Sequence, residues 1–251
     1  MEINIYKNKK ETSRKAALKA VSILNKTISQ KGIATFIMAT GVSQLDFIKA
    51  LIAEGNVDWS KTRMFHLDEY IGIPETHVAS FRKYLKEKFI SKINRPKEVN
   101  LINGNAGDPK KECDRLNQLL KNEIVDMAFV GIGENGHLAF NDPPADFEIE
   151  DSFIVVNLTE RCRKQQVGEG WFDSIKEVPQ QAISMSIKQI MKAKNIICTV
   201  PGKRKAQAVK DCFEINEISP EYPASMLKRH GDCFVFLDQF SANLLMKKIE
   251  F

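Results

Sequence analysis

Long apolar stretches are absent from this sequence of 251 residues. The longest ones, such as residues 34–39 and 127–132, fall far short of the roughly 20 residues that a membrane-spanning helix needs. The first residues are strand-like and then strongly charged, so the apolar segment of a secretory signal peptide is missing as well. We therefore expect a protein with no membrane segment that works in the cytoplasm.

Cysteine pairs and metal-binding patterns are also lacking. The five cysteines are odd in number, lie far apart and form no CxxC pair, so they cannot all close into intramolecular disulfides. The four histidines are not clustered, and no HExxH spacing occurs. We expect reduced, mostly buried thiols and no bound metal.

Neither sign of charge dominates the sequence. The 37 Lys and Arg residues are interleaved with 32 Asp and Glu residues, which gives a formal charge of +5. The basic run of Lys203, Arg204 and Lys205 has no interleaved aromatic residues and no recognisable nucleic-acid-binding module beside it. We expect no nucleic-acid partner, and we interpret this run as more suitable for a single phosphate ligand.

Short apolar runs alternate with amphipathic stretches along the chain, which predicts right-handed βαβ crossovers. No linker, repeat or charge block divides residues 1–251, so we expect one α/β domain: a doubly wound, Rossmann-like, mostly parallel sheet with helices on both faces. The predicted strands are 34–39, 64–67, 99–102, 125–131, 153–158, 196–200 and 233–237. The predicted helices are 14–29, 45–53, 78–90, 110–121, 183–192, 205–212 and 225–229, and residues 143–151 are predicted as a loop or a lid.

Ligands of such sheets bind beyond the carboxyl ends of the strands, where the first candidate is Thr40-Gly41-Val42-Ser43. Its glycine permits close approach of the backbone, while the hydroxyls and free amides at the start of a helix suit a phosphate group. An ordinary turn with Ser43 as the helix N-cap explains the same residues, and both interpretations can hold together.

Two adjacent carboxylates, Asp68 and Glu69, follow the next predicted strand. Neighbouring side chains on an extended segment point to opposite faces, so one can enter the ligand crevice while the other supports the scaffold. The spacing does not decide which carboxylate takes which role, and a solvated acidic pair is an equally simple explanation.

The most informative segment runs from Gly131 to Pro144. Three of its glycines match the dinucleotide pattern GxGxxG, but the two prolines that follow would stop the helix which that motif requires. What remains is a glycine-rich turn that presents His137, with Asn135 before it and Asp142 after it as groups that could orient the imidazole.

Together these motifs resemble the glucosamine-6-phosphate deaminase/isomerase family, whose wider superfamily includes the 6-phosphogluconolactonases. The resemblance extends from about Thr40 to the last predicted strand. It is carried by TGVS at 40–43, HLDEYIG at 66–72, LINGN at 101–105, the segment 131–143, and PASML at 223–227. LDEY and HLAFN within these segments favour the deaminases over the lactonases.

The resemblance implies conversion of glucosamine 6-phosphate to fructose 6-phosphate and ammonia, without a redox cofactor. His137 would assist ring opening, flanked by Asn135 and Asp142, and Asp68 would be the base that moves a proton from C2 to C1. The phosphate would be held by Thr40, Gly41, Ser43 and Lys205.

Three positions depart from the family pattern. Asp142 stands where many members have the longer Glu, so contact with His137 would require a shifted backbone or a water. Val42 replaces the second glycine of the phosphate loop. The family's phosphate-binding arginine is absent before Trp171, and Arg161, Arg163 or Lys164 could replace it.

Other functions remain compatible with these motifs. Galactosamine 6-phosphate differs from the expected substrate only at the C4 hydroxyl, which the sequence does not resolve. Hydrolysis of 6-phosphogluconolactone and a non-catalytic sugar-phosphate sensor are the remaining alternatives, and the sequence leaves open whether the chain forms a homo-oligomer.

Overall fold

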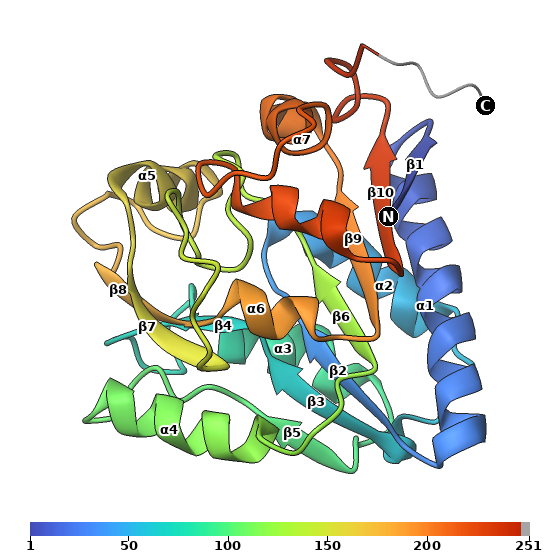
Figure 1. Ribbon diagram of the computed structural model, residues 1–251. Helices are drawn as coiled ribbons and strands as arrows, with labels where there is room; N and C mark the ends of the chain where they lie inside the picture. The colour runs from blue at the N-terminus through green and yellow to red at the C-terminus, as the bar shows by residue number, and fades with distance from the viewer. Residues whose placement is uncertain (247–251) are drawn as a thin grey trace.

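A computed structural model describes residues 1–246 and contains a seven-stranded and a three-stranded sheet (Figure 1). All neighbouring strands of the larger sheet are parallel, in the order β1-β10-β9-β6-β2-β3-β5. These strands are β1 (Glu2–Tyr6), β2 (Ala34–Met38), β3 (Thr62–His66), β5 (Glu98–Asn100), β6 (Met127–Val130), β9 (Asn195–Val200) and β10 (Cys233–Asp238).

Helices connect these strands and cover both faces of the sheet (Figure 1). The α-helices are α1 (Lys9–Lys31), α2 (Leu45–Ala53), α3 (Phe81–Lys88), α4 (Pro109–Leu120), α5 (Glu160–Gly168), α6 (Ile187–Met191) and α7 (Ala206–Phe213). The 3-10 helices are η1 (Val42–Gln44), η2 (Trp59–Lys61), η3 (Ile90–Lys92), η4 (Lys203–Lys205) and η5 (Pro223–Arg229).

The sheet separates two apolar layers, and β2 shows how its side chains are divided between them. Phe36 and Met38 point to the layer formed with α1, α2 and α3, whereas Ile37 points to the layer formed with α4, α6, α7 and η5. Alternation along the strand buries both faces because helices cover both. The predicted doubly wound, mostly parallel fold is therefore confirmed.

The predicted helix over residues 183–192 is wrong at its beginning. Residues 181–185 form β8 (Gln181–Met185), and α6 begins only at Ile187, where the Ser186 hydroxyl caps it by accepting a hydrogen bond from the Gln189 amide at 3.3 Å. Most of β8 is buried because it is the central strand of the smaller sheet. A short apolar run that is buried on both faces shows no hydrophobic periodicity, so its sequence does not distinguish a strand from a helix.

The smaller sheet is antiparallel, in the order β4-β8-β7. Its outer strands are β4 (Asp68–Tyr70), which the sequence analysis did not identify, and β7 (Phe153–Asn157), the predicted strand over 153–158. The 153–158 strand thus forms, but outside the parallel sheet. Helix α5, also missing from the predicted elements, follows β7 directly.

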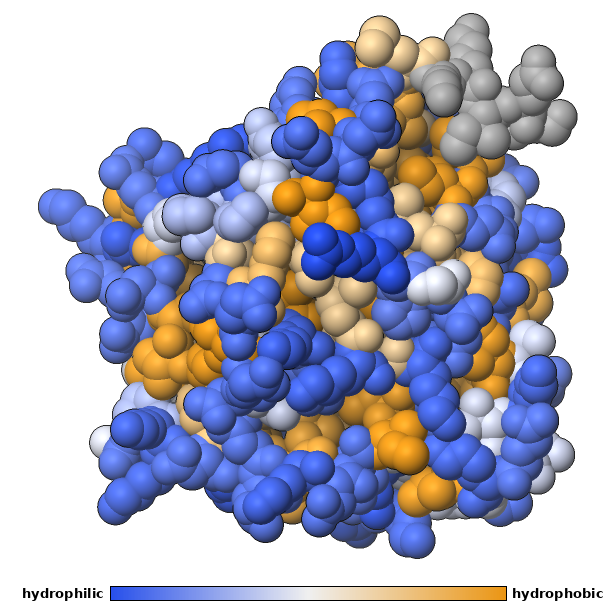
Figure 2. All heavy atoms as spheres, in the orientation of Figure 1, coloured by the Kyte–Doolittle hydropathy of each residue, from blue (hydrophilic) through white to orange (hydrophobic). Residues whose placement is uncertain are grey.

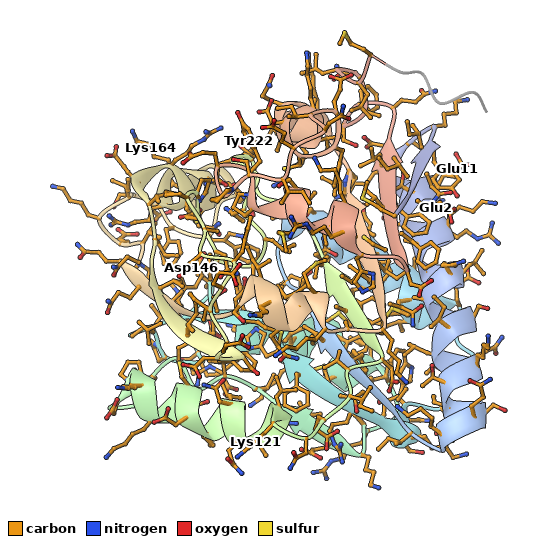
Figure 3. The ribbon with its side chains drawn as sticks, viewed as in Figure 1. Glu2, Glu11, Lys121, Asp146, Lys164 and Tyr222 are labelled. Carbon is orange, nitrogen blue, oxygen red and sulfur yellow. The ribbon has the colours of Figure 1, made fainter. Side chains whose placement is uncertain are left out.

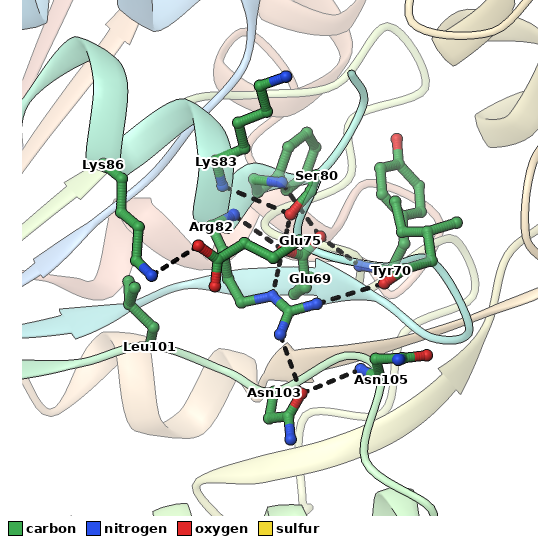
Figure 4. Close-up of polar contacts among 12 residues, drawn as sticks. Glu69, Tyr70, Glu75, Ser80, Arg82, Lys83, Lys86, Leu101, Asn103 and Asn105 are labelled. Carbon is green, nitrogen blue, oxygen red and sulfur yellow. Dashed lines mark hydrogen bonds and ion pairs between the residues drawn. The ribbon is translucent and has the colours of Figure 1, made fainter. Parts of the chain in front are cut away.

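Hydrogen bonds of the Glu69 side chain connect β4 to the beginning of α3 (Figure 4). Its buried carboxylate accepts hydrogen bonds from the Ser80 hydroxyl at 3.0 Å and from the amides of Phe81 and Arg82 at 3.1 and 2.8 Å. These amides belong to a helix N-terminus, which lacks partners of its own and favours negative charge. The Arg82 guanidinium lies 3.4 Å away, so the buried carboxylate is both paired and hydrogen-bonded.

The face of the molecule seen in Figure 2 is mostly hydrophilic, with apolar residues in separate patches. Among residues 1–246, no helix has the length and apolar character needed to cross a bilayer. All five cysteines are buried and unpaired, as the sequence analysis predicted.

Candidate active site

Four neighbouring strands, β9, β6, β2 and β3, end at the same edge of the larger sheet, and the segments that follow them meet in one pocket. The chain continues from β2 to β3 on one side and from β6 to β9 on the other, so β2 and β6 flank the point where the strand order reverses. Such a point is the usual ligand site of a doubly wound sheet. The polar residues lining the pocket are Thr40, Ser43, Asp68, His137, Gln165, Gln166, Glu169 and Lys205.

The loop after β2 is held in place by Gln44. Its side chain donates to the Thr199 carbonyl at 3.1 Å and accepts from the Thr199 hydroxyl at 2.8 Å, which ties the loop to β9. Thr40, Gly41 and Ser43 line the pocket, and Ser43 makes no capping hydrogen bond to α2 or η1. The hydroxyl oxygen of Thr40 is buried without a hydrogen-bond partner in the described chain, so this hydroxyl can form a hydrogen bond with a ligand.

Asp68 and Glu69 take the two opposite roles that strand geometry allows. Asp68 lines the pocket, whereas Glu69 anchors α3 on the other side of β4. Only 7% of Asp68 is exposed, and burial, together with the nearby Glu69 charge, raises the pKa of Asp68 to about 8. A carboxylate with such a pKa is a stronger base than an ordinary aspartate.

His137 contacts Asp142 directly. Its Nδ1 lies 3.2 Å from Asp142 Oδ1, with no need for a bridging water. A compact turn over residues 138–142, in which Ala139 has a left-handed φ of 52°, brings the short side chain back to the imidazole. An ionised carboxylate can only accept, so Nδ1 carries the proton and Nε2 remains free to act as a base.

Asp142 is the centre of a hydrogen-bond cluster that includes the predicted Asn135. Oδ1 also accepts from Asn135 Nδ2 at 2.9 Å, and Oδ2 accepts from the amide and the hydroxyl of Thr159 at 2.9 and 2.8 Å. Burial alone would raise the pKa of Asp142, but the hydrogen bonds and the imidazole charge outweigh it and lower the pKa to about 2. The carboxylate therefore stays ionised and keeps His137 in one orientation.

Lys205 is the cation that the structure brings to the pocket. It ends η4 after β9 and is only 7% exposed, and burial lowers the pKa of its ammonium group. Within residues 1–246, no carboxylate lies within 4.0 Å of its Nζ atom. The neighbouring Arg204 pairs with Glu134 at 2.6 Å, so the run 203–205 does not form one basic face.

Arg161 and Arg163 do not line the pocket. Arg161 donates to the Glu134 carbonyl at 3.3 Å, and Arg163 donates to the carbonyls of Ile175 and Val178 at 2.6 and 3.0 Å. Lys164 lies on the exposed surface of α5 (Figure 3). It pairs there with Glu160 at 2.5 Å. All three cations lie on faces of this helix other than the one that meets the pocket.

The pocket-facing residues of α5 and its end were missed by the sequence analysis. Gln165, Gln166 and Glu169 line the pocket, and together with buried Cys162 they follow a helical spacing of three and four residues. A signal for this helix was present, because Thr159 precedes the segment and caps it by accepting from the Cys162 amide at 3.2 Å.

His137, Asp142 and Cys162 are a cluster of the described residues whose ligand atoms lie within 4.8 Å of one another. Their chemistry does not favour a metal. Both oxygens of Asp142 already accept hydrogen bonds, and burial raises the pKa of the Cys162 thiol, which would have to lose its proton to bind a metal.

Comparison with known proteins agrees with this geometry. The family model for glucosamine-6-phosphate isomerases/6-phosphogluconolactonase matches residues 7–235. The chain belongs to this family. The resemblance inferred from the sequence motifs is therefore confirmed.

Relatives of this family match almost the whole chain. A glucosamine-6-phosphate deaminase of Oenococcus oeni is 37% identical over 234 residues, covering 93% of this chain and 95% of that protein. One from Thermoanaerobacter sp. is 36% identical over 259 residues, covering 100% and 99%. The solved structure of a monomeric glucosamine-6-phosphate deaminase superposes with a TM-score of 0.88 at 32% identity, covering 97% and 100%.

Gly133→Ala should displace His137 without disturbing the fold. A Cβ atom at this position would lie 2.2–2.4 Å from three atoms of the imidazole ring, so the ring would have to leave Asp142. We expect the NMR signal of the Nδ1 proton of His137 to shift or disappear while the unfolding temperature changes little. Gly231→Ala is the control, because a Cβ there meets nothing within 4 Å. An unchanged His137 signal in Gly133→Ala would contradict the described packing.

Asp68→Asn should stabilise the protein increasingly as pH rises. The unfolded chain loses this proton near pH 4, whereas the folded protein keeps it to about pH 8. Between these two pH values the free energy of unfolding of the wild-type protein therefore falls progressively, and above about pH 8 the loss is complete. Urea unfolding at pH 5, 7 and 9 should show the largest gain for Asp68→Asn at pH 9. Asp114→Asn, at an exposed position, is the control. A gain for Asp68→Asn that is the same at all three pH values would contradict the raised pKa of Asp68.

Proposed function

We propose that this chain converts glucosamine 6-phosphate and water to fructose 6-phosphate and ammonia. The observation that carries the proposal is that Asp68 and His137 lie in one pocket with the buried Lys205. A proton-transfer base, an oriented imidazole and a cation for a phosphate group are what this reaction requires. The deaminase relatives, which match nearly the full length of the chain, support the same substrate.

Binding of the phosphate would place the sugar for reaction. The amides and hydroxyls of Thr40, Gly41 and Ser43 would donate to the phosphate oxygens, and Lys205 would supply the charge. Fixing the sugar in this way turns proton transfer at the other end into a step between positioned groups.

His137 would open the sugar ring. Its Nε2 would take the proton of the C1 hydroxyl and return a proton to the ring oxygen, while Asp142 stabilises the charged imidazole. Asp68 would then remove the proton from C2 and deliver it to C1, while the C1 carbonyl oxygen gains a proton and the C2 amine loses one, which leaves a hydroxyl group at C1 and an imine at C2. Water would hydrolyse this imine and release ammonia, so the reaction needs no change of oxidation state overall and no redox cofactor.

We also propose that the protein works in the cytoplasm, because a reducing compartment keeps five buried, unpaired thiols reduced.

The alternatives to the proposed reaction are deamination of galactosamine 6-phosphate, hydrolysis of 6-phosphogluconolactone and a purely sensory role. An assay for ammonia with both amino-sugar phosphates and their N-acetyl forms, together with an assay for lactone loss, separates these alternatives. Ammonia release from glucosamine 6-phosphate that does not exceed the rate for the other compounds would contradict the assignment.

Asp68→Asn should lower ammonia release from glucosamine 6-phosphate by about 10² to 10⁴, the usual contribution of a general base, while substrate binding is retained. Because the base acts without its proton, kcat/KM of the wild-type protein should also rise with pH toward about 8. Turnover of Asp68→Asn close to that of the wild type would remove Asp68 from the mechanism.

Lys205→Ala should weaken binding of the phosphorylated amino sugar by about 1.5–3 kcal/mol, the value of a hydrogen bond to a charged group. Binding of unphosphorylated glucosamine should not change. The matched control is Lys203→Ala, since Lys203 is exposed at the other end of the same turn. Calorimetric titration of both variants decides the point, and unchanged affinity in Lys205→Ala would show that the phosphate lies elsewhere.

A further inference from the structure

Two consecutive glutamines of α5 line the pocket, but their amide groups are used differently. Gln165 is occupied at both ends, since its Oε1 accepts from the Glu134 amide at 2.9 Å and its Nε2 donates to Glu169 at 2.8 Å. Gln166 accepts from the Tyr70 hydroxyl at 2.6 Å through Oε1. Its Nε2 has no hydrogen-bond partner in residues 1–246, although only 4% of Gln166 is exposed.

Tyr70 fixes which end of the Gln166 amide faces the pocket. Its side chain is fully buried, with its ring 5.0, 5.1 and 5.4 Å from the rings of Phe81, Phe140 and Phe172. The ring cannot turn toward water, and Gln166 is the only hydrogen-bond partner of its hydroxyl in the described chain. A buried hydroxyl proton requires an acceptor, so the amide oxygen is held at Tyr70 and the NH₂ group points away from it.

The Nε2 atom of Gln166 is not among the fully buried atoms that lack a partner, so it is accessible from the pocket that Gln166 lines, and an acceptor on a ligand could bind to it in place of water. Asp68 and Tyr70 lie on the same face of β4, two residues apart, so the Tyr70–Gln166 pair belongs to the side of the pocket where Asp68 would act. Lys205 and the Thr40–Ser43 loop already provide donors for the phosphate.

We propose that Gln166 binds the substrate by donating a hydrogen bond from Nε2 to a hydroxyl oxygen of the sugar, with Tyr70 as its positioning residue. This inference rests on the proposed function and extends it to the recognition of the sugar chain. An ammonium group, which has no acceptor, would not satisfy this donor.

A double-mutant cycle tests the proposal with 2-amino-2-deoxyglucitol 6-phosphate, which has the hydroxyl groups of the open-chain sugar but lacks the C1 carbonyl and cannot isomerise. Gln166→Met should weaken its binding about 3- to 10-fold, the loss expected for one neutral hydrogen bond. Tyr70→Phe should weaken it as well, although Tyr70 does not line the pocket. In the Gln166→Met background, Tyr70→Phe should have no further effect, because there is no amide left to orient.

The control is Gln189→Met on α6. Gln189 is 6% exposed and accepts from the Ser152 hydroxyl at 2.9 Å, so this variant loses the same kind of bond at the same burial outside the pocket. The double variant also replaces both hydrogen-bonding partners by apolar groups, which keeps the test valid if Gln166→Met alone folds poorly. Thermal unfolding of each variant identifies that case.

Binding of inorganic phosphate distinguishes the acceptors. It should be unchanged in Gln166→Met, and an equal loss for phosphate and for the sugar phosphate would assign the donor to the phosphate and overturn the proposal. Affinity of Gln166→Met equal to that of Gln189→Met, or additive effects of Gln166→Met and Tyr70→Phe, would also overturn it.

Failure of this role can be distinguished from failure of the proposed function. If the wild-type protein released no ammonia from glucosamine 6-phosphate, the proposed function would fail. Normal ammonia release by the wild-type protein, together with unchanged binding in Gln166→Met, would refute the Gln166 role alone.

Discussion

The alternation of side chains along extended backbone is the constraint on which both the core and the pocket depend. In β2 it sends Phe36 and Ile37 into different apolar layers, so the central sheet is held from both sides. In β4 the same geometry separates two carboxylates that are neighbours in sequence. Glu69 is hydrogen-bonded to a helix N-terminus and paired with an arginine, and Asp68 remains in the pocket with a raised pKa.

Hydrogen bonds connect the pocket to helix α5, which covers it. Asp142 joins the imidazole of His137 to the first turn of α5 through Thr159, and Gln166 joins the same helix to β4 through Tyr70. His137, proposed for chemistry, and Gln166, proposed for recognition, are therefore both connected to α5. A shift of this helix would alter the orientation of His137 and the direction of the Gln166 amide at once.

Most of the sheet could be predicted from the sequence because its strands are short apolar runs separated by helices with clear periodicity. β8 could not, since a strand buried on both faces has no alternation to distinguish it. Asp68, His137 and Lys205 could be expected in one place because each follows a strand of the parallel sheet, and the structure brings all three to one pocket. Asn135 and Asp142 lie beside His137 in the same turn, so their contacts with it could be expected as well. Arg161 and Arg163 were proposed as phosphate ligands because they lie close in sequence to the position of the family's missing arginine. The segment instead forms a helix that points Gln165 and Gln166 to the pocket.

Because all five cysteines are buried, the rate at which a reagent labels each thiol measures how often the structure around that thiol opens. Burial raises the pKa of each thiol, so the reactive thiolate is rare and a labelling reagent can reach it only when the surrounding structure separates. Cys162 lies in α5, whereas Cys198 and Cys233 lie in neighbouring strands of the central sheet. Labelling rates at these positions would therefore distinguish movement of the covering helix from unfolding of the whole molecule, without any introduced probe.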